Sequence, residues 1–374
     1  MVRLGIDSRD AFAEHPRGVG KALSELIRHL MPLVSDWEVN LFTNRAGNNE
    51  FAAPAQTKWV DIRGDRFNAW EQIRLPLAAL TSRLDLLHCP SQTAPYFAPC
   101  PVVLTVHDLI PLRMDDGWPA GEVSRFRRYL ARSVAKARRI IAVSEFTRHD
   151  LLSEFRVPET KIDVIPWGVY VGRHETMSDD EWKTLCRTYD LRSPFFVAFG
   201  GGAPRKNVSC VLKAIALLTR AIGPDIQLVL VGVPSQGKSS VLALSNTLGI
   251  ADNVVLLSYL PDRVLSHLLT RSEALVYPSL YEGFGLPILE GMAMGAPVIT
   301  SNVTSMPETA GDAAVLIDPT SESEIADAMR ACYLNDLTKS EMRARGYRRV
   351  ATFSWKKTAA ATLSTYERAL NAGC

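Results

Sequence analysis

The chain has 374 residues, of which 47% are hydrophobic and 22% are charged. This length suits two domains, and the composition is typical of globular rather than disordered protein. A net charge of +2 argues against a general nucleic-acid-binding protein, so no nucleic acid is expected among its partners. The six cysteines are far apart and form no Cys-x-x-Cys pair, which favours free thiols over disulfides or zinc sites.

The N-terminus begins on a strand pattern instead of the basic-then-apolar order of a signal peptide. No apolar run in the sequence approaches the length that spans a membrane. We therefore expect a cytoplasmic protein, with at most peripheral contact at the inner face of the membrane.

Short apolar segments alternate with amphipathic stretches through the first half of the chain. A glycine-containing loop at 17–20 follows the first strand and leads into an amphipathic helix, and Ser144 is placed to cap a later helix. The predicted strands, in chain order, are 2–7, 38–43, 84–88, 102–107, 139–144 and 161–166.

A polar stretch at 172–193 interrupts this alternation and predicts a linker or a bridging helix. The same alternation then resumes, with a helix at 208–221 and a last helix at 355–370. The predicted strands of this half are 194–199, 226–231, 254–257, 274–277 and 297–300.

Alternating strands and helices predict parallel sheets with helices on both faces, and two such series predict two Rossmann-like α/β domains. We assign them to 1–171 and 194–353, joined by the linker 172–193 and followed by a helix at 354–374. Ligands of such sheets bind outside the carboxyl ends of the strands, at helix N-termini.

The motif with the most information lies at 281–290, where Glu282 and Glu290 flank a Gly-Phe-Gly-Leu-Pro turn that opens a helix. Amides of Gly283, Phe284 and Gly285 would point at an anion there, and Glu290 would accept hydrogen bonds from vicinal hydroxyls. The alternative is a loop carboxylate and a helix-surface glutamate without function, but the intervening turn favours a ligand site.

A second motif lies at 200–207 and reads Gly-Gly-Gly-Ala-Pro-Arg-Lys-Asn. The glycines allow the backbone to approach a ligand closely. Arg205 and Lys206 stand at a helix start, where the helix dipole disfavours cations. An Arg-Lys pair is often only a solvated surface feature, but here it favours binding of an anion such as a diphosphate.

Together these motifs resemble those of the retaining glycosyltransferases of family 4, particularly bacterial mannosyltransferases of polysaccharide assembly, and the resemblance extends over essentially the whole chain. It implies the GT-B fold, with two facing Rossmann-like domains, a central cleft and a last helix that crosses back onto the first domain. Further segments that resemble the family are 17–20, 105–108, 143–147, 164–169, 306–311 and 353–355.

The resemblance also implies a role for each candidate residue. Glu282 would bind hydroxyls of the donor sugar, Glu290 would bind the ribose, and Arg205 with Lys206 would neutralise the diphosphate. His107 would lie near the sugar and the acceptor, although a histidine that ends an apolar strand is often only a core residue. The remaining donor-binding residues it implies are Gly18, Gly201, Tyr259, Gly283, Phe284, Gly285 and Leu286.

Three positions depart from the family pattern. Many members have an arginine close after the glycine that ends the first strand of the second domain, whereas 200–202 are all glycine here. Many also have asparagine where Trp167 stands and aspartate where Tyr170 stands. Phosphate binding is therefore expected to depend more strongly on Arg205 and Lys206.

Cleavage of the sugar–phosphate bond produces an oxocarbenium-like sugar and a diphosphate anion. We expect Arg205, Lys206 and helix amides to stabilise the departing charge. No Asp-x-Asp motif is evident, so we expect no cofactor and a metal-independent reaction. We assign His107 to positioning rather than to general base catalysis.

The segment 125–139 is rich in arginine and, as a helix, would place Arg125, Arg128, Arg132, Lys136 and Arg139 on one stripe. Such a stripe would rest on anionic lipid and bring the enzyme to a lipid-linked acceptor. The alternative, which we favour slightly, is a solvated face whose apolar side packs on the sheet.

The sequence therefore predicts a retaining transferase that moves a hexose, with a preference for mannose from GDP-mannose, to a glycan or lipid-linked saccharide. Alternatives are a UDP-hexose-dependent transferase, a GT-B sugar-nucleotide epimerase or phosphorylase, and a non-catalytic subunit that binds a nucleotide sugar. The acceptor and the oligomeric state leave no signature in the sequence.

Overall fold

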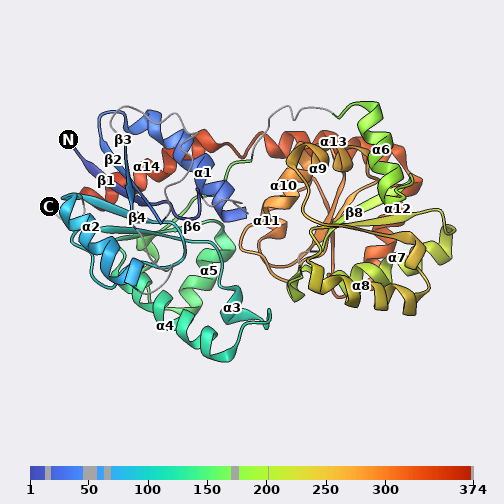
Figure 1. Cartoon of the computed structure of the whole chain (residues 1–374), viewed down its shortest axis with the longest axis horizontal. Helices are drawn as coiled ribbons and strands as arrows, with labels where there is room; N and C mark the ends of the chain where they lie inside the picture. The colour runs from blue at the N-terminus through green and yellow to red at the C-terminus, as the bar shows by residue number, and fades with distance from the viewer. Residues whose placement is uncertain (13–17, 45–56, 63–68, 170–176, 201, 372–374) are drawn as a thin grey trace. The chain divides into compact units, whose positions relative to one another are not determined.

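In a computed structural model, the described residues are 1–12, 18–44, 57–62, 69–169, 177–200 and 202–371. The chain forms two compact units (Figure 1). Unit 1 comprises Met1–Arg113, Trp118–Gly168 and Phe353–Cys374, and unit 2 comprises Met114–Gly117 and Val169–Thr352. Each unit contains one parallel sheet covered by helices, as the alternation of strands and helices predicts.

Within its described residues, unit 1 contains a seven-stranded sheet in the order β3-β2-β1-β4-β5-β6-β7. All neighbouring strands are parallel. The central strands are buried and almost wholly apolar because helices cover both faces. The strands are β1 (Arg3–Asp7), β2 (Glu38–Thr43), β3 (Thr57–Asp61), β4 (Leu86–Cys89), β5 (Val102–Val106), β6 (Arg139–Ala142) and β7 (Ile162–Val164).

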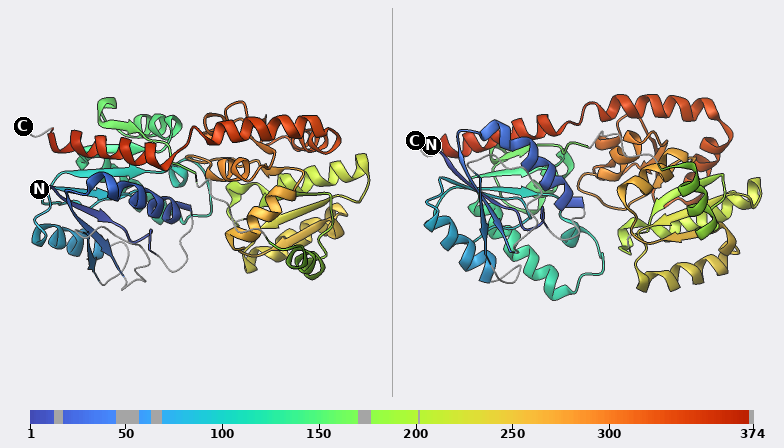
Figure 2. Two further views of the ribbon diagram at one scale, coloured as in Figure 1. Left: turned by 90° about the horizontal axis from the view of Figure 1, so that it is seen from above. Right: turned by 45° about the horizontal axis from the view of Figure 1, so that its top comes forward.

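Two hydrophobic clusters hold the helices of unit 1 on opposite faces of its sheet. Helices α1 and α14 contribute to one cluster, and η2, α2 and α4 contribute to the other (Figure 2). The helices are α1 (Gly18–Leu30), η1 (Met31–Val34), η2 (Trp70–Arg74), α2 (Leu75–Thr81), α3 (Ile110–Arg113), α4 (Ala120–Lys136), α5 (Glu145–Glu154), η3 (Glu159–Lys161) and α14 (Trp355–Asn371).

The described part of unit 2 contains a six-stranded sheet in the order β10-β9-β8-β11-β12-β13, again with parallel neighbours. Its strand order reverses between β8 and β11, and in open α/β sheets ligands bind outside the strand ends at such a point. The strands are β8 (Phe195–Phe199), β9 (Gln227–Val231), β10 (Val254–Leu257), β11 (Leu275–Tyr277), β12 (Val298–Ser301) and β13 (Val315–Ile317).

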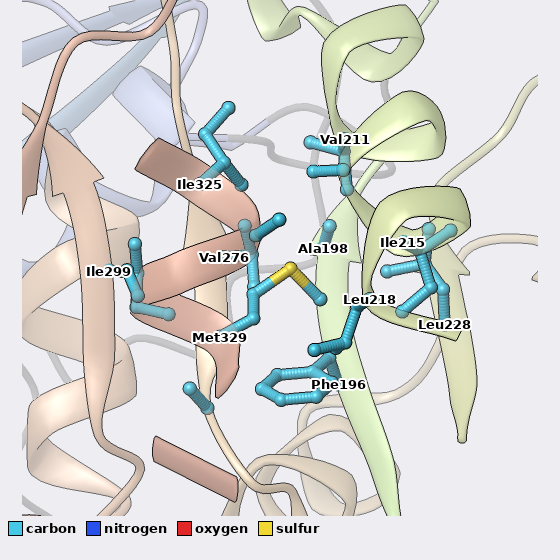
Figure 3. Packing of buried hydrophobic residues seen from close by; sticks show 14 of the residues in the cluster. Phe196, Ala198, Val211, Ile215, Leu218, Leu228, Val276, Ile299, Ile325 and Met329 are labelled. Atoms are coloured by element: carbon cyan, nitrogen blue, oxygen red, sulfur yellow. The ribbon is translucent and has the colours of Figure 1, made fainter. Parts of the chain in front are cut away.

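One hydrophobic cluster of unit 2 lies between the sheet and helices α7 and α12. Met329 of α12 is fully buried in the same cluster as Val276 of the sheet and Ile215 and Leu218 of α7 (Figure 3). The helices are α6 (Asp179–Tyr189), η4 (Pro204–Lys206), α7 (Val208–Ile222), α8 (Ser235–Leu248), η5 (Ala251–Asn253), α9 (Asp262–Arg271), α10 (Leu286–Ala293), α11 (Met306–Ala310), α12 (Glu322–Leu334) and α13 (Asp336–Val350).

The predicted strands are present within about two residues of their expected ends, and β2 and β10 match at both ends. Two strands were missed, the polar β3 and the three-residue β13. The stretch predicted as a linker or a bridging helix contains the helix α6, which Ser178 begins with a capping box and which belongs to unit 2. Ser144 caps α5 through a 3.0 Å hydrogen bond from the Thr147 amide, as expected.

The helix predicted over 125–139 ends at Lys136, so the stripe that we proposed there is wrong at its last residue. Arg139 lies in β6. Its guanidinium donates to both carboxylate oxygens of Asp163, with Nε 3.1 Å from Oδ2. None of the described helices combines the length and the apolarity that crossing a bilayer demands.

Candidate active site

The turn after β8 presents Arg205 and Lys206. Pro204 begins a short 3-10 turn, and Asn207 follows in a left-handed conformation with φ of 57°. The Asn207 side chain donates to the Pro278 carbonyl at 3.2 Å and to the Pro319 carbonyl at 2.6 Å. It therefore ties the loops after β8, β11 and β13 together.

The predicted Gly-Phe-Gly turn leads directly into α10. Gly285 precedes the helix with φ of +86°, a conformation that glycine adopts without strain. Phe284 is buried, and its carbonyl accepts a hydrogen bond from the Thr309 hydroxyl. Leu286 is the first residue of α10. Pro287 has no N–H and the Ile288 amide donates to the Gly285 carbonyl at 2.9 Å, so Leu286 provides the first amide of this helix.

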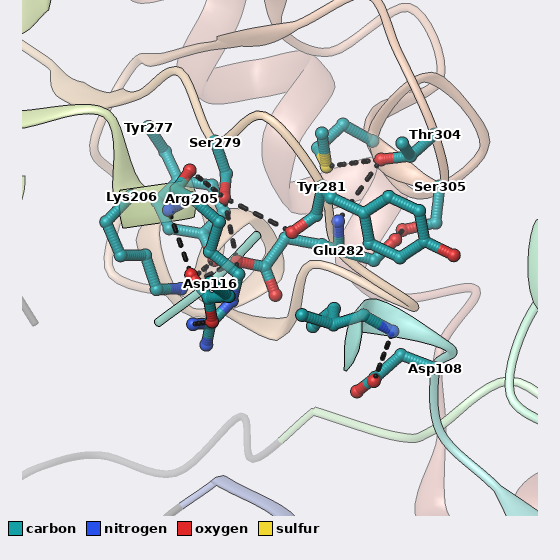
Figure 4. A network of polar contacts seen from close by, with 12 residues as sticks. Asp108, Asp116, Arg205, Lys206, Tyr277, Ser279, Tyr281, Glu282, Thr304 and Ser305 are labelled. Carbon is teal, nitrogen blue, oxygen red and sulfur yellow. Dashed lines mark hydrogen bonds and ion pairs between the residues drawn. The ribbon is translucent and has the colours of Figure 1, made fainter. Parts of the chain in front are cut away.

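Because β8 and β11 are neighbours, their loops place the two cations beside Glu282 (Figure 4). Lys206 Nζ lies 2.7 Å from Glu282 Oε1 and 2.6 Å from the Tyr277 hydroxyl. Arg205 Nε lies 3.6 Å from the same Glu282 oxygen. Ser279 Oγ donates to it at 2.8 Å. The structure thus brings together three of the predicted catalytic residues in unit 2.

The charges in this cluster hold Glu282 ionised. Burial alone would raise the pKa of Glu282, but the positive charges of Lys206 and Arg205 and the hydrogen bonds from Lys206 and Ser279 bring it below its usual value. Burial together with the Glu282 charge raises the pKa of Tyr277 well above its usual range. Tyr277 is therefore a neutral hydroxyl that supports Lys206.

Asp116 is a member of the cluster that sequence reasoning missed. Its Oδ2 lies 2.8 Å from Arg205 Nη1, and its Oδ1 accepts from the Arg205 amide at 3.1 Å. The side chain is only 6% exposed. It comes from Met114–Gly117, a four-residue part of unit 2 that lies far from Arg205 in sequence and carries no motif.

Other predicted donor-binding residues have different surroundings. Glu290 is partly buried on α10. Gly283 is buried. Tyr259, after β10, is 62% exposed, which leaves its ring accessible to a ligand. Gly201 lies outside the described residues.

Gly18 belongs to unit 1, where it was predicted to lie in a loop. That prediction was wrong in detail, because Gly18 is the first residue of α1. It is exposed with φ of +28°, a conformation that glycine adopts without strain.

His107 follows β5 in unit 1 and is 7% exposed. Its Nε2 lies 2.5 Å from the Pro90 carbonyl, which only accepts hydrogen bonds, so Nε2 carries the proton. Nδ1 is then an acceptor, and among the described residues it has no hydrogen-bond partner. Burial lowers the pKa of His107 to about 4, so the ring is neutral near pH 7.

A buried charged network lies at the end of β1 and was not foreseen. Arg9 Nη2 lies 2.6 Å from Asp7 and 3.3 Å from Glu71, and its guanidinium stacks over Trp70 at 3.8 Å from the ring centroid. The Thr93 hydroxyl donates to Glu71 at 3.0 Å. Its signal in the sequence was the polar run Asp-Ser-Arg-Asp directly after a strand.

The described residues contain no group of three or more His, Cys, Asp or Glu side chains placed to hold a metal ion. Cys89, Cys100, Cys186, Cys210 and Cys332 are free thiols. Arg205 and Lys206 contribute positive charge at the β8–β11 strand ends.

Two families match the chain in tandem. Residues 16–173 match "Glycosyltransferase Family 4", and residues 189–349 match "Glycosyl transferases group 1". The chain is 30% identical over 269 residues to O-antigen chain mannosyltransferase B of Escherichia coli, covering 71% of this chain and 70% of that protein. It is also 30% identical over 285 residues to MMP alpha-(1->4)-mannosyltransferase of Mycolicibacterium hassiacum, covering 72% and 66%.

Solved structures show the same fold. Sucrose-phosphate synthase of Thermosynechococcus elongatus superposes with a TM-score of 0.78 at 18% identity, over 100% of both chains. Anabaena Alr3699/HepE in complex with UDP-glucose superposes with a TM-score of 0.74 at 17% identity, over 97% of this chain and 99% of that one.

Two parallel α/β units, a cationic cluster at a sheet switch point and these matches define a glycosyltransferase with the GT-B fold. The chain belongs to glycosyltransferase family 4.

Proposed function

We propose that this enzyme transfers mannose from GDP-mannose to a glycan or a lipid-linked saccharide, with retention of anomeric configuration. The relatives named as mannosyltransferases support the sugar. The observation that carries the proposal is the cluster of Arg205, Lys206 and Glu282 beside the first turn of α10.

Arg205 and Lys206 would bind the diphosphate, and the amides at the start of α10 would contact sugar and phosphate. The ionised Glu282 accepts hydrogen bonds, which suits sugar hydroxyls. Glu290, whose charge also acts on Tyr277, would bind the ribose. The exposed ring of Tyr259 suits stacking with the base.

In the proposed reaction the bond between the anomeric carbon and the phosphate oxygen breaks, and the acceptor oxygen bonds to that carbon from the same face. The acceptor proton passes to a phosphate oxygen of the leaving diphosphate, which departs as GDP. Arg205 and Lys206 stabilise the growing negative charge, so no metal ion is required. Activity in EDTA tests that part of the proposal.

His107 supports this reaction by positioning. Its neutral ring offers the Nδ1 lone pair to a hydroxyl group, while the hydrogen bond to Pro90 fixes the ring orientation. A low pKa and burial disfavour the imidazolium that general base catalysis would create.

A UDP-hexose is the second candidate donor, because the structurally similar Anabaena protein is solved with UDP-glucose. A GT-B epimerase or phosphorylase is a different outcome, recognised by free sugar released without acceptor or by dependence on inorganic phosphate. A non-catalytic subunit would bind nucleotide sugar without product.

We also propose that α4 brings the enzyme to the inner face of the membrane and so to a lipid-linked acceptor. Arg125, Arg128, Arg132 and Lys136 of α4 are exposed, while Leu130 and Val134 pack on the sheet. The buried apolar side agrees with the alternative in which this helix packs on the sheet, and the exposed basic side is the surface that we propose to contact anionic lipid.

The test combines ligand binding with transfer assays. A thermal-shift series should show stabilisation by GDP above UDP and ADP, because a ligand that binds only the native state raises its stability. Lys206→Ala and Glu282→Gln should each reduce transfer by about two orders of magnitude. Lys213→Ala is the matched control, because Lys213 is exposed and pairs with Glu322 at 2.6 Å in the same unit.

Three results would contradict the proposal. A thermal-unfolding midpoint that no nucleoside diphosphate changes would exclude the proposed donor site. Near-normal turnover by both Lys206→Ala and Glu282→Gln would exclude the roles proposed for these two residues. A product of inverted configuration by NMR would exclude the retaining mechanism.

A further inference from the structure

The helical segment of η2 and α2 is apolar on two opposite faces. Its inner face buries Trp70, Leu75 and Ala79 completely in the core of unit 1. Its outer face carries Ile73, Leu77 and Leu80, at helical spacing, with 58%, 56% and 59% of their surfaces exposed. Three large aliphatic side chains in a row on one exposed face are costly in water and mark an interaction surface.

Phe97 extends this apolar surface. It is 82% exposed and lies in the loop between β4 and β5. The amide of the preceding residue, Tyr96, donates to Gln72 Oε1 at 2.9 Å, and Gln72 adjoins Ile73. This hydrogen bond holds the Phe97 loop against the turn that carries Ile73.

The same loop joins the apolar face to the basic helix α4. The Tyr96 ring stacks on Tyr129 of α4, with centroids 5.5 Å apart. The Arg132 guanidinium lies over the Tyr96 ring at 4.7 Å. Since α2 and α4 also pack on the same face of the sheet, the aliphatic row, Phe97 and the α4 cations belong to the same side of unit 1.

The charged residues of this surface are basic. Residues 72–84 contain Arg74 and Arg83 but no Asp or Glu, and residues 123–144 contain seven Arg or Lys and again no acid. Within the described parts of the chain, no ion pair engages Arg74, Arg128 or Lys136. Their charges are therefore available to an anionic partner.

We propose that Ile73, Leu77, Leu80 and Phe97, bordered by Arg74, Arg128 and Arg132, insert into an anionic phospholipid bilayer. An exposed apolar row beside unpaired cations, with no acid between them, matches acyl chains beneath anionic headgroups. The inference rests on the membrane contact proposed for α4 and deepens it, because it assigns the apolar insertion to α2 and the Phe97 loop. Arginine stems and aromatic rings bridge the two environments.

Sedimentation with vesicles tests the inference. The full-length enzyme should pellet with equimolar phosphatidylglycerol and phosphatidylethanolamine, and much less with phosphatidylcholine alone. The triple change Ile73→Ser, Leu77→Ser and Leu80→Ser should lower the partition coefficient by about 100-fold or more, given the apolar area removed. A control triple change, Leu33→Ser, Leu242→Ser and Leu334→Ser, removes leucines elsewhere that are 43%, 44% and 65% exposed and should leave the partition coefficient unchanged.

Charge and folding are tested in parallel. Arg128→Glu with Arg132→Glu should abolish the preference for phosphatidylglycerol. Circular dichroism and the thermal shift by GDP show that each variant is folded and still binds nucleotide. Nucleotide binding and vesicle binding are thereby measured separately. Failure of the proposed function can therefore be distinguished from failure of the membrane inference.

Three outcomes would overturn the inference. The first is a wild-type enzyme that does not pellet with anionic vesicles. The second is equal vesicle binding by the two triple variants, which would show that the α4 cations bind the vesicles without apolar insertion by α2. The third is a wild-type dimer, seen by light scattering, that only the Ile73, Leu77 and Leu80 changes dissociate, which would assign the surface to a second copy of the chain.

Discussion

The Asp116 carboxylate binds the groups of Arg205 that we propose as ligands of a phosphate. It contacts both the guanidinium and the backbone amide of Arg205, while Glu282 engages Lys206. Two carboxylates thus balance two cations. The negative charges of these carboxylates repel a diphosphate and compete with it for Arg205 and Lys206. A diphosphate therefore binds most tightly when one carboxylate moves away from its cation.

We expect Asp116→Asn to tighten GDP binding by about 5–10-fold, since it removes a competing charge and keeps an oxygen for the Arg205 amide. Calorimetry measures the dissociation constant. Asp115→Asn is the matched control, because Asp115 is exposed and its carboxylate accepts a hydrogen bond from the Gly117 amide at 3.1 Å, away from Arg205. Weaker binding by Asp116→Asn would instead make Asp116 a residue that positions Arg205 for the phosphate.

The difference between Arg205 and Asp116 shows what the sequence can predict at this scale. Arg205, Lys206 and Glu282 each follow a strand within a recognisable motif, and strand ends meet at one edge of a parallel sheet. Asp116 stands 89 residues from its partner in a segment without periodicity, so only the folded chain reveals the contact. The free Nδ1 of His107 likewise depends on a hydrogen bond to Pro90 that no pattern encodes.

At the scale of elements, α10 depends on the left-handed residue that precedes it. Gly285→Ala would force a side chain into φ of +86°, with its Cβ 3.0 Å from Ile288 Cδ1. We expect a loss of about 1–2 kcal/mol in the free energy of unfolding. Transfer should fall further than stability, because the first amides of α10 would move.

Urea denaturation and a transfer assay measure both effects. The control is Gly237→Ala inside α8, where the added Cβ meets only Pro234 and Val233 at 3.5 Å or more and where alanine favours the helix. Equal losses in the two variants would show that the conformation of Gly285 is not the cause.

Strands were predictable where burial makes them apolar throughout. Central strands such as β8 and β11 have this character, whereas the edge strand β3 reads Thr-Lys-Trp-Val-Asp with no fully buried residue. The three-residue β13 has too few positions to show a period. The exposed aliphatic row could not be predicted because the helical segment that carries it is apolar on both its inner and its outer face. Such a segment lacks the amphipathic pattern by which a surface helix is recognised.

At the scale of the molecule, unit 1 is built from both ends of the chain. Tyr366 of α14 is fully buried, and its hydroxyl lies 2.7 Å from His88 Nδ1. His88 Nε2 lies 2.8 Å from the Thr105 hydroxyl, and burial lowers the His88 pKa to about 3. A neutral imidazole therefore links α14 to the sheet.

Tyr366→Phe should lower the free energy of unfolding by about 1–3 kcal/mol, because it leaves a buried ring nitrogen without its partner. The GDP dissociation constant should not change, because Tyr366 lies in unit 1 and the cationic cluster lies in unit 2. Calorimetric unfolding with GDP titration checks both. Tyr189→Phe, at an exposed tyrosine, should change stability by less than about 0.5 kcal/mol, and a similar loss in both variants would refute the role of the hydroxyl.

The return of α14 to unit 1 has a consequence for biosynthesis. Residues 169–352 separate the last strand of unit 1 from the helix that covers one face of its sheet. At about 5–20 residues per second, a ribosome takes roughly 10–40 s to translate them. During that interval the nascent domain leaves uncovered the apolar surface of α1, β4, β5 and β6 that α14 later packs against, which makes it a natural client for chaperones that bind growing polypeptides.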